Sequence, residues 1–107
     1  MAAKRNIPVN GRTRLVAIFG WPLNYTLSPL FQNAALIERG IDACYLPLAT
    51  ESPARFKALA KGLMASPHFL GANVTNPYKV DALRLAHTAT AAARAIGAAN
   101  VFGAPGK

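Results

Sequence analysis

The chain has 107 residues, of which 52% are hydrophobic and 15% are charged, so it can bury a core and form about one small domain. This composition excludes a disordered tail, and a single cysteine excludes a disulfide framework. The net charge is +8, from 12 basic and 4 acidic residues, and no stretch approaches the roughly 20 apolar residues of a membrane span. We therefore expect a cytoplasmic protein.

The N-terminal residues 1–12 are polar, basic and aperiodic, and we expect a flexible lead-in to a domain that covers residues 13–107. Residues 14–20 form a continuous apolar run with β-branched members, which predicts a strand buried on both faces. Ser28 and Pro29 then begin a predicted helix, with Ser28 as the N-cap and Gly40 at the end. The apolar stripe of this helix consists of Leu30, Phe31, Ala34, Ala35 and Ile37.

Two further strand-then-helix pairs follow along the chain. Residues 43–48 and 69–74 predict strands, and the helices after them begin at Ser52-Pro53 and at Asn76-Pro77. Residues 86–99 are rich in alanine and predict another helix, and residues 100–102 predict the start of a strand.

This alternation of elements predicts an α/β fold with three layers, in which helices flank a mostly parallel β-sheet. In such a fold the loops at the carboxyl ends of the strands converge on one edge and carry the chemistry. These loops are residues 20–28, 48–52 and 74–77.

The strongest catalytic candidate is Lys79, which would be the third residue of its helix if Asn76 is the cap. The positive end of a helix disfavours a second positive charge, so a partly desolvated Lys79 would be easier to deprotonate than a surface lysine. That property suits general acid–base catalysis. The alternative interpretation is a solvated lysine in a first helical turn.

Small polar side chains near Lys79 are candidates for binding a ligand. If the first loop is extended, the hydroxyls of Thr26 and Ser28 point the same way and could hold a carboxylate at the helix start. Asn73 and Thr75 alternate onto one face in the same manner, and Asn100 is a further polar candidate. The alternative is that these residues cap helices or satisfy turns. The two histidines, His68 and His87, have no partners at ligand spacing, so we expect no metal site.

Four motifs, in this order and spacing, resemble the N-terminal, substrate-binding domain of shikimate dehydrogenases. The resemblance runs from about Leu15 to Val101. The motifs are F-G-W-P at 19–22, T-L-S-P at 26–29 followed by Q-N-A-A at 32–35, N-V-T-N-P-Y-K at 73–79 and A-R-A-I-G-A-A-N at 93–100. Residues 42–48 belong to the same resemblance.

The resemblance implies NADPH-dependent reduction of 3-dehydroshikimate to shikimate, in the synthesis of chorismate and the aromatic amino acids. It implies that Thr26 and Ser28 bind the substrate carboxylate, and that Lys79 is catalytic and also contacts the substrate. Its remaining implied substrate-binding residues, which hydrogen-bond the ring hydroxyls, are Asn73, Thr75 and Asn100. NADP is implied as the cofactor, but the family's catalytic aspartate and its nucleotide-binding domain are absent from this chain, which also lacks a G-x-G-x-x-G motif.

Several alternatives stay open. Thr26 stands where the family usually has serine, and its extra methyl group could shift the preference toward quinate. The chain alone is not expected to be catalytically competent, and a free-standing, non-catalytic shikimate-binding module is an alternative. The basic charge could also indicate nucleic acid, but no aromatic residues are interleaved with the basic ones, so we expect no nucleic-acid partner and no membrane partner. Monomer and homodimer are both open.

Overall fold

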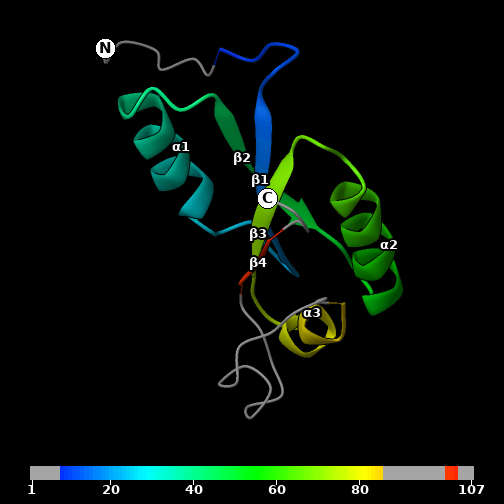
Figure 1. Ribbon diagram of the computed structural model, residues 1–107. Helices are drawn as coiled ribbons and strands as arrows, with labels where there is room; N and C mark the ends of the chain where they lie inside the picture. The colour runs from blue at the N-terminus through cyan, green and yellow to red at the C-terminus, as the bar shows by residue number, and fades with distance from the viewer. Residues whose placement is uncertain (1–7, 86–100, 104–107) are drawn as a thin grey trace.

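The computed structural model describes residues 8–85 and 101–103 (Figure 1). The elements of these residues, in chain order, are β1 (Arg14–Gly20), α1 (Ser28–Glu38), β2 (Ala43–Ala49), α2 (Pro53–Met64), β3 (Phe69–Val74), α3 (Lys79–Leu85) and β4 (Val101–Gly103). The predicted helix over residues 86–99 lies outside the described residues, and so does Asn100. The three predicted strands and the three helices before that region are confirmed, with differences of no more than three residues at their ends.

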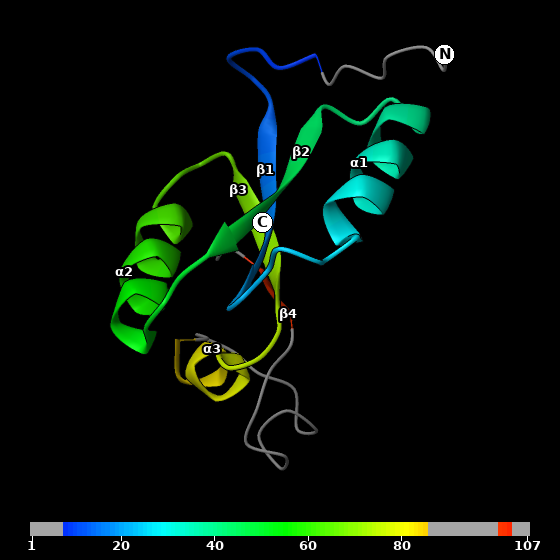
Figure 2. The same cartoon turned by 180° about the vertical axis from the view of Figure 1, so that it is seen from behind.

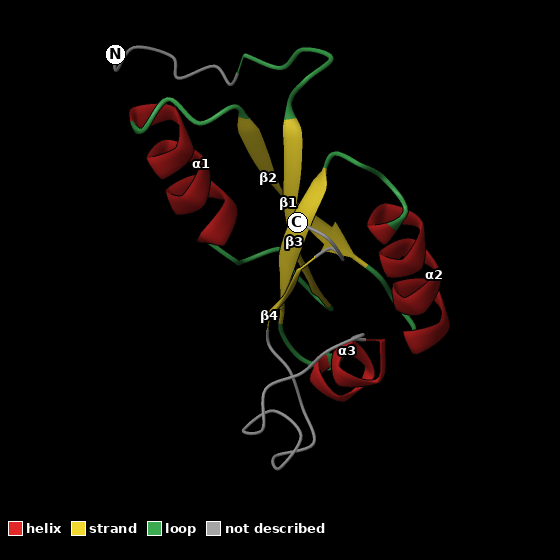
Figure 3. Ribbon diagram, viewed as in Figure 1, coloured by secondary structure: helices red, strands yellow, loops and turns green. Residues whose placement is uncertain are grey.

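The four strands form one sheet in the order β2-β1-β3-β4 (Figure 3). Strand β1 pairs in parallel with both β2 and β3, whereas β4 pairs antiparallel with β3. Residues 17–20 of the central strand β1 are buried, as the continuous apolar run predicts. The expectation of a mostly parallel α/β sheet is therefore confirmed.

Helices cover both faces of the sheet. Figures 1 and 2 show α1 on one side and α2 with α3 on the other. The side of α2 and α3 holds the larger core, whose fully buried large side chains are Phe19, Phe56, Phe69 and Tyr78. The side of α1 holds a smaller core of Ile18, Leu23 and Tyr45, with Val16 and Leu36 packed against it. Alternate residues of β1 thus point to opposite layers.

An aromatic stack ties the larger core together. The ring of Phe56, from α2, lies edge-on to Phe19 of β1 at 5.2 Å between ring centres. The Phe56 ring also stacks in parallel on the ring of Tyr78, with 4.8 Å between the ring centres. These geometries are favourable for aromatic pairs, and they connect the central strand to the turn that precedes α3.

The predicted apolar stripe of α1 is partly wrong. Leu30 and Phe31 are 67% and 64% exposed, and α1 contains no fully buried residue. The helix instead turns Asn33, Ala34, Leu36 and Ile37 toward the sheet as half-buried residues. The prediction failed because it counted only apolar residues, whereas the helix is fixed to the sheet through the side chain of Asn33.

Two of the three predicted helix caps are wrong. Ser28 is the first residue of α1, after Leu27, and makes no capping hydrogen bond. Helix α3 begins at Lys79, so Asn76 is not its cap, because residues 75–78 form a turn closed by a 3.1 Å bond from the Tyr78 N–H to the Thr75 carbonyl. The third start is confirmed: the Ser52 hydroxyl accepts the N–H of Arg55 at 3.2 Å and caps α2.

The lead-in to β1 is described from Pro8 onward and is exposed up to Arg12. Asn10 and Thr13 both hydrogen-bond the Asp42 carboxylate, at 3.5 and 2.7 Å. No helix in the described part of the chain is long and apolar enough to cross a membrane. Within that part, no three histidine, cysteine or acidic side chains gather as they would around a metal ion.

Candidate functional site

The carboxyl ends of β1, β2 and β3 meet at one edge of the sheet, as parallel strands require. Backbone hydrogen bonds join the loops there. The Thr75 N–H donates to the Phe19 carbonyl at 2.9 Å, and the Trp21 N–H donates to the Asn76 carbonyl at 3.1 Å. The first and third predicted loops are thus held side by side.

Gly20 allows this close approach. A Cβ atom at position 20 would overlap Cγ2 of Thr75, and it would lie 3.0 Å from Leu23 Cδ2 and 3.1 Å from the Asn76 carbonyl. The absence of a side chain lets the loops pack against each other. Thr75, a predicted ligand-binding residue, is placed by this contact next to the end of β1.

A phenol links two of the predicted site residues. The Tyr45 hydroxyl, from β2, donates to Oδ1 of Asn73 in β3 at 2.8 Å, although β1 lies between these strands. The Ser28 side chain lies beside the same phenol. Burial raises the pKa of Tyr45 above its ordinary 10.0, and the Ser28 side chain opposes part of that rise. Ser28 and Asn73 therefore both lie next to the Tyr45 phenol.

Thr26 is connected to Ser28 by a hydrogen bond to the Ser28 backbone. Its Oγ1 accepts the N–H of Ser28 at 3.3 Å, and both residues are half-buried. The N–H of Ser28 is therefore bound to Thr26, whereas the Ser28 side chain faces Tyr45. Because this pair stands at the positive end of the 11-residue helix α1, an anionic group is favoured there.

Lys79 begins α3 on a firmly held backbone. The residue before it, Tyr78, is 1% exposed, stacks on Phe56, and donates its hydroxyl to the carbonyl of Thr50. Lys79 itself is half-buried. The nearby carboxylate, Asp81, pairs with Lys57 of α2 at 3.7 Å. Among residues 8–85 and 101–103, the Lys79 ammonium group has no ion-pair partner.

The described residues thus place five of the six predicted site residues at or beside one edge: Thr26, Ser28, Asn73, Thr75 and Lys79. Asn100 lies outside the described residues, and β4 begins directly after it at Val101, which pairs with Asn73. Sequence reasoning missed Tyr45. A signal existed, because a tyrosine inside a buried strand needs a partner for its hydroxyl.

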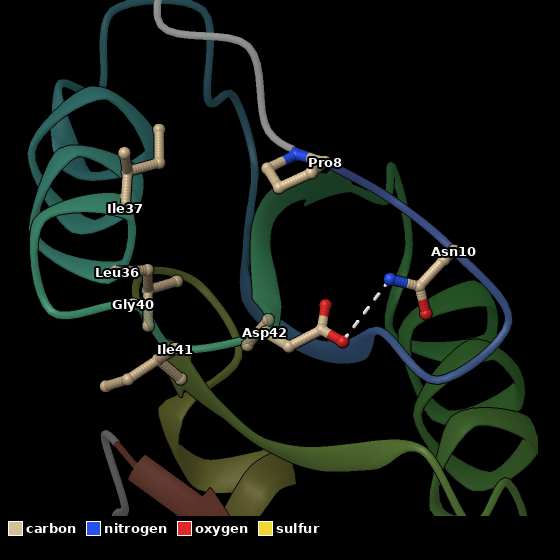
Figure 4. Close-up of a pocket in the computed structure, with 8 residues that line it drawn as sticks. Pro8, Asn10, Leu36, Ile37, Gly40, Ile41 and Asp42 are labelled. Carbon is tan, nitrogen blue, oxygen red and sulfur yellow. Dashed lines mark hydrogen bonds between the residues drawn. The ribbon is translucent and has the colours of Figure 1, made fainter.

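A separate hollow of about 300 Å³ lies at the opposite end of the sheet (Figure 4). The residues that line it are Pro8, Asn10, Leu36, Ile37, Gly40, Ile41, Asp42 and Ala43. Figure 4 shows Asn10 reaching Asp42 across its rim. None of the predicted site residues lines this hollow, which the lead-in and the turn after α1 form.

Comparison with known protein families gives one match over most of the chain. The family described as "Shikimate dehydrogenase substrate binding domain" matches residues 18–102. A relative from Geobacter sulfurreducens, named shikimate dehydrogenase (NADP(+)), is 43% identical over 95 residues. That match covers 89% of this chain but 32% of the relative, so the chain spans about a third of the length of such relatives.

Solved structures agree with this match. A shikimate dehydrogenase from Aquifex aeolicus superposes with a TM-score of 0.81 at 33% identity, over 90% of this chain and 35% of that one. A shikimate 5-dehydrogenase from Listeria monocytogenes, in complex with shikimate and NAD, gives a TM-score of 0.80 at 27% identity. The match covers 94% of this chain and 33% of the Listeria monocytogenes chain.

Proposed function

The chain belongs to the family of the shikimate dehydrogenase substrate-binding domain, and on that premise we propose that it binds the substrate for reduction of 3-dehydroshikimate to shikimate. The observation that carries the proposal is the group formed by Ser28, Tyr45 and Asn73 at the carboxyl edge of the sheet. A polyhydroxylated acid needs hydrogen-bonding groups of this kind, because each buried hydroxyl must find a partner.

The proposed roles follow from position and chemistry. Thr26 and Ser28, at the positive end of α1, hold the carboxylate. Asn73, Thr75 and Asn100 hydrogen-bond the ring hydroxyls. Lys79 exchanges a proton with the substrate oxygen at which carbonyl and hydroxyl interconvert. Support for this role comes from its half-buried place on the backbone held by Tyr78.

The residues of this chain do not fit NADP. The sequence contains no G-x-G-x-x-G turn that would receive a pyrophosphate at a helix start. We therefore assign the cofactor to a separate nucleotide-binding domain, and the role of this domain is to bind and orient the substrate. The relative from Geobacter sulfurreducens is named for NADP(+), which supports NADP as the cofactor of the complete enzyme. We place this enzyme in the cytoplasm and in aromatic amino-acid biosynthesis.

Titration of the chain with shikimate, followed by NMR chemical shifts, tests the proposal. We expect saturable shifts in residues of the carboxyl edge. Ser28→Ala should weaken shikimate binding about tenfold, the usual effect of losing a hydrogen bond to a charged group. The same substitution should weaken binding of the methyl ester of shikimate, which lacks the carboxylate, much less. Quinate, titrated in parallel, tests whether the methyl group of Thr26 shifts the preference.

A matched control is Ser66→Ala, whose hydroxyl accepts the N–H of His68 in the turn before β3, at the other end of the sheet. This variant should bind shikimate as the unmodified chain does. Absence of any shift with millimolar shikimate would contradict the proposed function. An equal loss of affinity for shikimate and for its ester would contradict the carboxylate role of Ser28.

A further inference from the structure

We propose that Tyr45 is a positioning residue, whose hydroxyl fixes the Asn73 carboxamide so that this side chain presents N–H donors to the substrate. The inference rests on the proposed function and assigns a role to a residue outside the predicted site. Its basis is the 2.8 Å hydrogen bond from the Tyr45 hydroxyl to Oδ1 of Asn73.

The phenol reaches Asn73 across a strand. In the sheet, Tyr45 pairs with Val16 and Asn73 pairs with Ile18, so the two side chains lie diagonally on either side of β1. Both face the layer of α1, where Tyr45 is 3% exposed within the smaller core. The hydrogen bond therefore connects β2 to β3 directly at the site edge.

The backbone of Tyr45 is fixed as firmly as its hydroxyl. Asn33 of α1 donates Nδ2–H to the Tyr45 carbonyl and accepts the Tyr45 N–H at Oδ1, both at 2.8 Å. The Ser28 side chain lies beside the phenol, at the start of the same helix. Because the tyrosine is held at both ends, its hydroxyl offers one defined donor to Asn73.

This donor decides the chemistry that Asn73 can offer. A carboxamide has one oxygen acceptor and two N–H donors. The Tyr45 hydroxyl occupies one lone pair of this oxygen, and none of the described residues accepts a hydrogen bond from the two N–H groups, so these donors are available to a ligand. A protonated phenol is needed for this arrangement, and the buried, raised-pKa phenol stays protonated at neutral pH. Position 73 therefore selects a ligand oxygen that accepts a hydrogen bond, such as a hydroxyl or carbonyl oxygen.

Phenylalanine at position 45 separates positioning from packing, because it keeps the ring and removes only the hydroxyl. We expect Tyr45→Phe to weaken shikimate binding by about fivefold to tenfold. Tyr25→Phe is the matched control, because Tyr25 is 92% exposed and its hydroxyl should not matter. In an Asn73→Ala background, Tyr45→Phe should change affinity by less than about twofold, since the partner is already absent.

A ligand-free measurement makes the test independent of the proposed function. The side-chain amide resonances of Asn73 should move strongly in Tyr45→Phe, whereas those of Asn33 should move little. Unchanged Asn73 resonances would overturn the inference, even if the unmodified chain failed to bind shikimate. If that chain binds shikimate and Tyr45→Phe binds it equally well, the positioning role is wrong and the proposed function stands. If Tyr45→Phe weakens shikimate binding as much in the Asn73→Ala background as in the unmodified chain, the role of Tyr45 is in packing. That result would also overturn the positioning role.

Discussion

At the scale of single residues, Gly20 decides how closely the loops of the site can approach. It lies where β1 ends, and the space that a side chain would need is filled by Thr75, Leu23 and the Asn76 carbonyl. Two of these contacts belong to the loop that leads to Lys79. The requirement for glycine is thus a matter of space between two loops, and it couples the stability of the domain to the geometry of the site.

Gly20→Ala should lower the free energy of unfolding by about 1–3 kcal/mol, because overpacking forces the surrounding backbone to move. Gly62→Ala is the control. Gly62 lies inside α2, where an added Cβ atom would meet no other atom within 4 Å, and alanine there should stabilise the chain by about 0.5–1 kcal/mol. Urea denaturation monitored by circular dichroism measures both changes. Equal stability of Gly20→Ala and the unmodified chain would show that the loops can separate without cost.

Lys79→Ala tests the catalytic role in a polypeptide that joins this domain to a nucleotide-binding domain. We expect kcat to fall by about 10²–10⁴-fold, the usual contribution of general acid–base catalysis. The KM for shikimate should change only a few fold, because other residues hold the ligand. Lys57→Ala, which removes a lysine paired with Asp81, is the control and should keep its kcat. A higher KM with unchanged kcat would instead assign Lys79 to binding.

The sequence alone identified polar residues in or after the predicted strands, because Thr26 and Ser28 lie in the loop after the first strand and Asn73 lies near the end of the third. It did not identify Tyr45 or Asn33. Both lie inside regular elements, where periodicity favours packing roles, and their hydrogen-bond partners are 28 and 12 residues away in sequence. Such partners depend on strand order, which places β1 between β2 and β3.

At the scale of elements, α1 is attached to the sheet by a polar contact from Asn33 as well as by the packing of Leu36. The helix has no fully buried residue, and its Asn33 side chain fills the hydrogen-bonding positions of the Tyr45 backbone as a neighbouring strand would. Strand β2 lies at the end of the strand order, so this contact also protects an edge strand. The start of α1, with Thr26 and Ser28, is positioned by the same contact.

Asn33→Ala should lower the free energy of unfolding by about 1–3 kcal/mol, because it leaves the Tyr45 N–H and carbonyl without partners. It should also weaken shikimate binding, since the start of α1 would lose its fixed place against the sheet. Gln32→Ala, at the neighbouring exposed position, should change neither quantity. Thermal unfolding and the NMR titration measure the two effects. Loss of stability with unchanged affinity would show that other contacts hold the start of α1.

The starts of the helices show where a local sequence pattern no longer suffices to predict the role of a capping residue. Ser52 was predicted correctly because its hydroxyl caps a neighbouring N–H within the same segment. At Ser28 and Asn76 the same signal misleads. The Ser28 side chain lies beside the Tyr45 phenol, and the Asn76 carbonyl accepts the N–H of Trp21. Both residues are recruited by distant parts of the chain, which a local pattern does not contain.

At the scale of the whole molecule, two effects of alkaline pH oppose each other. The net charge of +8 destabilises the compact state through repulsion, and deprotonation of lysines relieves it. Exposed charges are screened by salt, so this relief is small at physiological ionic strength. The buried phenol of Tyr45 acts in the other direction, because it donates to Asn73 and so joins β2 to β3 only while it is protonated.

Titration of Tyr45 should therefore lower the stability of the whole domain above pH 10. The unfolded phenol titrates near 10.0, whereas burial raises the folded pKa. Between these two values the unfolded state holds fewer protons, so the free energy of unfolding falls as pH rises. Below pH 10 the contribution is fully present.

Urea denaturation at several pH values between 8 and 11 tests this linkage. Tyr45→Phe should show a shallower loss of stability above pH 10 than the unmodified chain. Tyr25→Phe, which removes an exposed phenol, should keep the full slope. Changes in lysine charge affect the three proteins alike, so they cancel in the comparison. Parallel curves for Tyr45→Phe and the unmodified chain would mean that the phenol can ionise without disturbing the contact between β2 and β3.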